Sequence, residues 1–372
     1  MHLSLPQSPE VAVGRLAGSF NDVTNSYKFF WFLAILDHVK TNQATIIPIK
    51  ELLAQMVAFV WYPANYYLLS FGKQDQLRNL TQQLLESTAL KVDAKPAIVR
   101  AAAVEQLAYS SHIGRELLKL GNYVPYRFLR PFVADGLRGL DDWKVNAAVV
   151  VEAERAFEIR PQDTPYRFIG KDAIELSPPW QRYFSRHHEI LTGFCFWRLI
   201  NYLQRNNPNV TNIAGKLFAP EQRDLKLAKQ FWNTVLSTRG PLTCIYSGRV
   251  MTPKNYSLDH FLPWRFVAHD LLWNLIPTPK DVNSAKSDNL PDSAYFEAFA
   301  RLQYEAAQAV AASGKPALLE DYILLLRLEG ISGLQSLPFN EFQKGLYDTI
   351  APQMQIARNM GFRVNWRYAT PM

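Results

Sequence analysis

One stretch of the sequence, residues 243–291, contains several side chains that could act together in a reaction. Asp259 and His260 are adjacent and end a predicted short strand, and a proline-containing loop follows them. Asn283 and Lys286 lie three residues apart in a short helix that a proline is predicted to begin, so both should occupy the same helix face. The pattern therefore predicts a β-β-α unit that brings a carboxylate, an imidazole, an amide and an ammonium group to one place.

The chemistry that suits this set is metal-assisted hydrolysis of a phosphodiester. A hard ion such as Mg²⁺ prefers oxygen ligands and keeps several waters, so one carboxylate and one amide oxygen suffice when the phosphate also binds. We expect Asp259 and Asn283 to provide these two oxygens to Mg²⁺, or to Mn²⁺ in its place. The ion would stabilise charge on the phosphate and on the departing oxygen.

Three further side chains complete the predicted site. His260 should point to the opposite side of the strand from Asp259, where it can take a proton from the attacking water near neutral pH. Lys286 would add a fixed positive charge near the phosphate. Asn274, in the connecting loop, is better suited to hydrogen-bond the loop backbone and so fix the geometry around His260.

These residues resemble the HNH nuclease module, also called ββα-metal, and in particular the HNH domain of RNA-guided CRISPR effector nucleases. That version has an Asp-His pair, a middle Asn, a helical Asn, a Lys one turn later and a Ser-Asp-Asn-Val-Pro-like exit. The corresponding residues here are Asp259, His260, Asn274, Asn283, Lys286 and Ser287 to Pro291. The resemblance implies that Asp259 and Asn283 bind metal, that His260 is the base and that Asn274 supports the loop.

The cysteines depart from many members of that family. Many HNH modules carry two Cys-x-x-Cys pairs that hold a structural zinc ion. Here Ser247 stands where the partner of Cys244 would be, and Cys195 is the only other cysteine. We therefore expect no structural zinc, a buried Cys244 and flanking helices that hold the module together. Two cysteines also favour the reducing cytoplasm.

The elements around this stretch are predicted to be mainly helical, giving an α+β protein overall with the small module inserted before the C-terminal helices. We divide the chain into a helical region 1–120, a mixed then helical region 121–240, the module 241–291, and helices 292–372 packing on the module. Short strands are predicted at 147–151 and 166–169, and an amphipathic helix is predicted at 219–238.

Composition limits the partners. With 48% hydrophobic and 20% charged residues among 372, the chain can form a substantial core, and global disorder is excluded. Its longest apolar run is far shorter than a bilayer span and no secretory signal is visible, so we expect a soluble cytoplasmic protein without a membrane partner. The net charge of +7 permits a polyanionic partner.

The basic residues near the module allow two interpretations. A surface that follows a nucleic-acid backbone is one, and an ordinary solvated helix face is the other. The residues concerned are Arg223, Lys226 and Lys229 on the predicted helix, with Arg249 and Lys254 in the module.

The predicted function is a DNA endonuclease that nicks or cuts double strands. Bacterial HNH proteins of this layout often serve in anti-phage defence or restriction, so partner proteins of a defence system are also expected from the resemblance. Two alternatives stay open, namely an RNase or nuclease toxin, because the phosphate chemistry is the same, and a non-catalytic nucleic-acid-binding subunit. The oligomeric state is left open.

Overall fold

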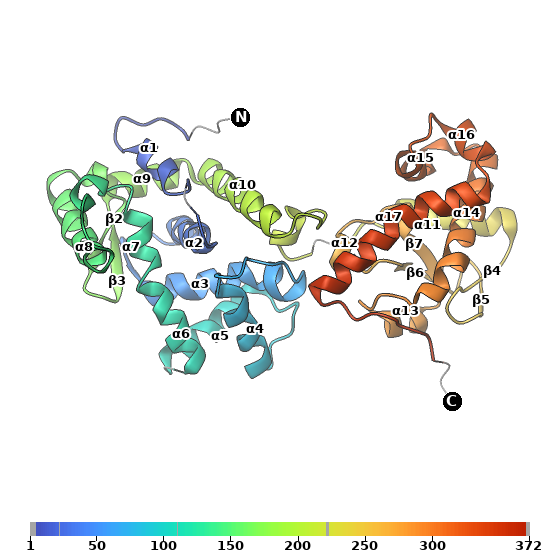
Figure 1. The fold of residues 1–372 in the computed structure, drawn as a ribbon, viewed down its shortest axis with the longest axis horizontal. Helices are drawn as coiled ribbons and strands as arrows, with labels where there is room; N and C mark the ends of the chain where they lie inside the picture. The colour runs from blue at the N-terminus through green and yellow to red at the C-terminus, as the bar shows by residue number, and fades with distance from the viewer. Residues whose placement is uncertain (1–4, 22, 110, 221–222, 370–372) are drawn as a thin grey trace. The chain divides into compact units, whose positions relative to one another are not determined.

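The computed structural model describes residues 5–21, 23–109, 111–220 and 223–369. Helices make up most of these residues, and the sheets are small, with two or three strands each (Figure 1). The predicted fold class, a mainly helical protein with a small module toward the C-terminus, is confirmed. Within the described residues, none of the helices has the length and apolar character needed to cross a membrane.

The chain divides into two units that each have their own core. The first comprises Met1–Pro208 and Lys216–Ala219, and the second comprises Asn209–Gly215 and Pro220–Met372. The predicted module therefore lies wholly in the second unit.

The first unit is built around one fully apolar helix, α2 (Tyr27–Thr41). Every side chain from Phe29 to Leu36 is buried, because neighbouring helices cover all sides of this segment. Phe32 stacks on Phe128 at a ring distance of 5.7 Å and meets Phe184 edge-on. The other helices of this unit are α1 (Val13–Gly18), α3 (Ile49–Trp61), α4 (Leu77–Ser87), α5 (Pro96–Ala108), α6 (His112–Gly121), α7 (Val124–Leu129), α8 (Asp142–Ile159), α9 (Pro178–Arg186) and α10 (His188–Asn206).

A small antiparallel sheet also belongs to the first unit. Its strand order is β1-β3-β2, formed by β1 (Ile46–Pro48), β3 (Ala173–Leu176) and β2 (Tyr166–Ile169). The strand predicted at 166–169 is therefore confirmed, whereas the one predicted at 147–151 is wrong, because those residues lie inside α8. Val145, Val149 and Ala153 are buried at helical four-residue spacing, so packing of this one face outweighs the strand preference of the valines.

In the second unit, helices surround two short β-hairpins. The first hairpin pairs β4 (Leu242–Thr243) with β5 (Val250–Met251), and the second pairs β6 (Ser257–His260) with β7 (Leu275–Thr278). The helices are α11 (Lys226–Arg239), α12 (Trp264–Val267), α13 (Lys280–Lys286), α14 (Phe296–Ala312), α15 (Glu320–Leu326), α16 (Ile331–Ser336) and α17 (Phe339–Met360). They occupy the yellow-to-red part of Figure 1.

Two of these helices hold the second hairpin through buried hydrogen bonds. Trp232 of α11 donates its indole N–H to the carbonyl of Leu275 at 3.1 Å. The side-chain amide of Gln303, in α14, donates to the carbonyls of Trp273 and Leu275 at 3.0 Å each. The hairpin is therefore anchored by helices before and after it in the chain.

One segment beside the module differs from its prediction, and the C-terminal tail adds contacts to the module. The helix predicted at 219–238 begins at Lys226, and residues 223–225 before it are not helical, so Arg223 lies ahead of the helix rather than on it. The C-terminal tail docks on the module, because the amide of Trp366 donates to the carbonyl of Leu290 at 3.0 Å and its ring meets Tyr246 edge-on.

Candidate active site

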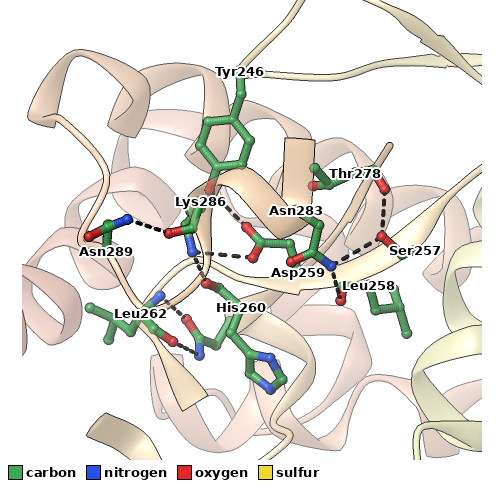
Figure 2. A network of polar contacts seen from close by, with 11 residues as sticks. Tyr246, Ser257, Leu258, Asp259, His260, Leu262, Thr278, Asn283, Lys286 and Asn289 are labelled. Atoms are coloured by element: carbon green, nitrogen blue, oxygen red, sulfur yellow. Dashed lines mark hydrogen bonds and ion pairs between the residues drawn. The ribbon is translucent and has the colours of Figure 1, made fainter. Parts of the chain in front are cut away.

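The β6–β7 hairpin sets the directions of Asp259 and His260. In the antiparallel register Asp259 lies opposite Ile276 and His260 lies opposite Leu275. Successive side chains of a strand point to opposite faces, and Figure 2 shows the carboxylate of Asp259 near α13 while the ring of His260 points the other way. The two side chains are 3% and 5% exposed, so the protein covers both faces.

The carboxylate of Asp259 is held by two buried partners. Tyr246, in the turn after β4, donates its hydroxyl to Oδ2 at 3.1 Å. Lys286, in the last turn of α13, places Nζ 3.2 Å from Oδ1. Burial raises the pKa of the Asp259 carboxyl, and the Lys286 ammonium opposes this rise. Both carboxylate oxygens are thus fixed in position.

Lys286 has a structural task in addition to its charge. Its side chain is fully buried, and Nζ also donates to the backbone carbonyl of His260 at 2.5 Å. One ammonium group therefore connects α13 to the carboxylate and to the end of β6 (Figure 2). A buried charge is tolerated when it is paired in this way.

Asn283, one turn before Lys286, has an unambiguous amide orientation. Its Nδ2 lies 3.0 Å from the carbonyl of Leu258 and 3.1 Å from the hydroxyl of Ser257. A carbonyl oxygen only accepts hydrogen bonds, so the atom facing Leu258 must be the nitrogen. The Asn283 side-chain oxygen is then the atom left to act as a ligand, and Figure 2 shows this side chain beside Asp259.

On the opposite face, His260 is paired with a carboxylate that the sequence analysis missed. Its Nε2 lies 2.7 Å from Oδ1 of Asp270, in the loop after α12. A carboxylate accepts the N–H, so this bond selects the tautomer with a proton on Nε2 and a lone pair on Nδ1. The only signal in the sequence was an acidic residue in the connecting loop, which is too common to single out.

The burial of His260 favours the neutral form of its imidazole. Burial lowers the pKa of its imidazole, and Arg223 lowers it further, while Asp270 and Asp259 oppose the shift. A neutral imidazole with a free lone pair is the form that can accept a proton.

Asn274 fixes the backbone where β6 ends. Its Oδ1 accepts from the amide of Leu262 at 2.8 Å, and its Nδ2 donates to the carbonyl of the same residue at 3.0 Å. The side chain is fully buried. Among the described residues, no hydrogen bond joins it to the imidazole of His260. Its effect on His260 therefore passes through the backbone.

The donor set fits a hard divalent ion. A carboxylate and an amide oxygen on neighbouring elements are the ligands that Mg²⁺ and Mn²⁺ accept when water and phosphate fill the remaining positions. Within the part of the chain that the structure describes, no group of three or more His, Cys, Asp or Glu is placed to hold an ion. Asp259 and Asn283 are the residues that would hold one.

The five basic residues of the predicted nucleic-acid surface differ in their interaction partners. Lys226, Lys229 and Lys254 are exposed. Arg249 donates to both carboxylate oxygens of Asp281, at 2.6 and 2.7 Å. Arg223 is exposed, lies 5.7 Å from the ring centre of Trp264 and acts electrostatically on His260, so of the five it has the clearest connection to the site.

One comparison with known protein families matches the stretch of chain that carries this site. The sequence profile of the HNH endonuclease family matches residues 244–292, which include β6, β7, α13 and every polar residue of the site except Arg223. No curated protein and no solved structure matches the chain. Residues 244–292, with their strand–strand–helix arrangement and their Asp-His pair, are therefore similar to the HNH endonuclease domain.

Proposed function

We propose that this protein is a divalent-metal-dependent endonuclease that hydrolyses DNA phosphodiester bonds at the site around Asp259. The observation that supports this most is that the two faces of β6 carry different chemical groups. One carries the fixed Asp259 carboxylate and the Asn283 oxygen, and the other carries the His260 base oriented by Asp270. The family match supports nuclease chemistry in general.

In the proposed mechanism, Nδ1 of His260 accepts the proton of the attacking water, because Nε2 is occupied by Asp270. Asp259 and Asn283 would hold the metal ion, which would stabilise the negative charge on the phosphate. Tyr246 and Lys286 keep the Asp259 carboxylate in place before substrate arrives, so little reorganisation is needed.

Substrate binding relies on the exposed cations of the second unit. Arg223 acts electrostatically on His260, and a phosphate placed near His260 would meet its positive charge. Lys229 and Lys254 are exposed and available for contacts to neighbouring phosphates, and Lys226 is exposed but lies 3.7 Å from a carboxylate oxygen of Asp224. Such contacts position a strand without reading its sequence. A role in bacterial anti-phage defence or restriction, together with other proteins of such a system, follows from the family resemblance.

The test is cleavage of supercoiled plasmid with Mg²⁺ or Mn²⁺. Wild type should nick the plasmid, since a single HNH site cuts one strand at a time, and His260→Ala should remove at least 99% of the activity. His269→Ala is the matched control, because this histidine lies in the same loop and packs against Trp273, and it should cleave normally.

The outcomes separate the candidate functions. Metal-dependent nicking that only His260→Ala removes supports the proposal. Equal cleavage by both alanine variants and wild type would assign the activity to a contaminant or to another base. Cleavage of a labelled RNA but not of the plasmid would replace DNA by RNA, and binding of DNA without cleavage would favour a non-catalytic subunit.

A further inference from the structure

The first unit contains two adjoining cavities that the nuclease site does not use. They have volumes of about 370 and 560 Å³ and share four lining residues, Asn25, Tyr27, Tyr123 and Arg127. The beginning of α2, the residues just before α7 and α7 itself supply this common wall. Each cavity is within the size range of sites that bind small organic ligands.

The smaller cavity is cationic. Lys28, Arg127 and Arg130 line it, and none of its described lining residues is acidic. Lys28 donates to the carbonyl of Ser19 at 3.1 Å. Nε of Arg130 is buried without a hydrogen-bond partner. A buried donor without a partner is costly, so this end of the cavity is suited to an anion.

The charges around Arg130 also favour an anion at this end of the cavity. Burial lowers the pKa of its guanidinium, and the like charge of Arg127 lowers it further, whereas Asp142 of α8 opposes this effect. Two arginines held close enough to repel each other gain from an anion that contacts both. A phosphate group can accept several charge-assisted hydrogen bonds from such a pair.

The shared wall is aromatic. The ring of Tyr123 is about half exposed, at 51%, and the Arg127 guanidinium lies 5.4 Å from its centre. The hydroxyl of Tyr27 accepts from the amide of Gln76 at 2.7 Å, which fixes its position. Asn25 presents a buried side-chain oxygen without a partner. Exposed aromatic rings next to arginines are the platforms on which nucleobases stack.

The larger cavity continues into a region rich in amides. Gln76, Asn79 and Gln83 line it, and each can both donate and accept hydrogen bonds, as the edge of a base requires. Its acidic residue, Glu116, is paired with Lys119 and so leaves this end close to neutral.

We propose that these two cavities form a binding site for a nucleoside phosphate, with the phosphate at Arg127 and Arg130, the base against Tyr123 and the base edge toward the amides. The nucleoside phosphate is either a free nucleotide or one unit of a single strand. The site lies wholly in the first unit, outside residues 244–292, so it does not depend on the proposed nuclease activity.

The experiment uses the full-length His260→Ala chain in EDTA, so that no probe is cleaved. Fluorescein-labelled single-stranded 12-mers of DNA and RNA carrying 5-iodouracil are titrated by fluorescence anisotropy and then photocrosslinked, and the crosslinked peptide is sequenced. AMP and inorganic phosphate are added as competitors. The test variants are Tyr123→Ala and Arg127→Ala, which change exposed side chains.

The matched controls are Tyr109→Ala and Arg138→Ala, which alter a 78% exposed tyrosine and an 82% exposed arginine elsewhere in the first unit. We expect a crosslink at Tyr27 or Tyr123, and we expect Tyr123→Ala to weaken the crosslinked complex by about five- to 150-fold while the controls leave it unchanged. Competition by AMP identifies a free-nucleotide site, and binding of the 12-mers without such competition identifies a strand site. Both results support the proposal.

Three results would overturn it. The first is the absence of a crosslink in the first unit. The second is equal weakening by the test and control variants. The third is displacement by inorganic phosphate as effective as displacement by AMP, together with no effect of Tyr123→Ala, because the site would then recognise an anion and not a nucleoside.

Discussion

At the residue scale, the site depends on charges that the protein buries in pairs. Asp259 is 3% exposed and Lys286 is fully buried, and each is the other's counter-ion. Removing one member leaves an uncompensated charge, whereas removing both leaves none. The same reasoning predicts which single substitutions the second unit will not tolerate.

Lys286→Met should destabilise the second unit by about 3–5 kcal/mol, because it leaves the buried Asp259 carboxylate unpaired. Adding Asp259→Asn should recover much of that loss. Urea unfolding of the single and double variants gives both numbers. Lys344→Met is the control, since this lysine pairs with Asp348 on the exposed face of α17, and it should change the free energy of unfolding by less than about 0.5 kcal/mol. Equal effects at 286 and 344 would contradict the pairing argument.

Asp270→Asn should lower kcat about 10²–10⁴-fold while leaving Mn²⁺ binding and KM for DNA nearly unchanged, because Asp270 acts only by orienting His260. Steady-state cleavage kinetics and Mn²⁺ titration calorimetry measure these quantities. In a His260→Ala background the same substitution should have no further effect. A further loss there, or weaker metal binding, would show that Asp270 acts on something other than the imidazole.

Asp75 in the first unit makes stability depend on pH. Burial raises the pKa of this carboxyl from 3.8 to about 6, against three hydrogen bonds from Ser26 and Leu77 that favour the charged form. The folded state therefore holds the proton more tightly than the unfolded state does. Between about pH 4 and pH 6, stability should fall as pH rises, by up to about 3 kcal/mol, and then level off.

The check is a series of urea midpoints for the first unit across this pH range. Asp75→Asn removes the titrating group and should abolish this part of the slope. A slope of the same size in the variant would assign it to other groups.

At the element scale, the module consists of elements too short to be stable alone. The strands of both hairpins have two or four residues, and α13 has seven. An isolated two-stranded hairpin is marginal in water, so the contacts with α11, α14 and the docked tail are needed to stabilise the module.

Asn274→Ala tests how the loop is held. It would leave the amide and carbonyl of Leu262 buried without partners, at a cost of about 1–3 kcal/mol for each group. We expect a loss of stability in urea unfolding, together with lower nuclease activity because β6 ends at His260. Asn289→Ala removes a single, part-buried bond to Lys286 and should cost about 1 kcal/mol. Identical costs at the two positions would show that the paired bonds have no special role.

At the scale of the whole molecule, two units with separate cores predict two unfolding transitions. Mn²⁺ should raise the midpoint of one of them only, because the proposed ligands Asp259 and Asn283 lie in the second unit. At a concentration a hundred times the dissociation constant the gain is about 2.7 kcal/mol. Calorimetry with and without Mn²⁺ measures it, and Asp259→Asn should remove it. A shift of both transitions, or one that survives Asp259→Asn, would place the ion elsewhere.

The sequence by itself determined the helical fold class and the module, because helix periodicity and the spacing of Asp259, His260, Asn274, Asn283 and Lys286 are local properties of the chain. It misassigned residues 147–151, because valine favours strands on average and only packing of one face decides otherwise. It also began α11 too early, since a polar segment can extend a helical pattern without joining the helix.

Only the tertiary structure decided which residues of different elements contact one another. Asp270 meets His260, Lys286 reaches both Asp259 and the carbonyl of His260, and Tyr246 completes the carboxylate's surroundings. The cavities of the first unit likewise arise where α2, α4, α6 and α7 converge. Periodicity and spacing describe neighbours along one element. The partner of a buried polar group is set instead by which elements pack together, and that depends on the core as a whole.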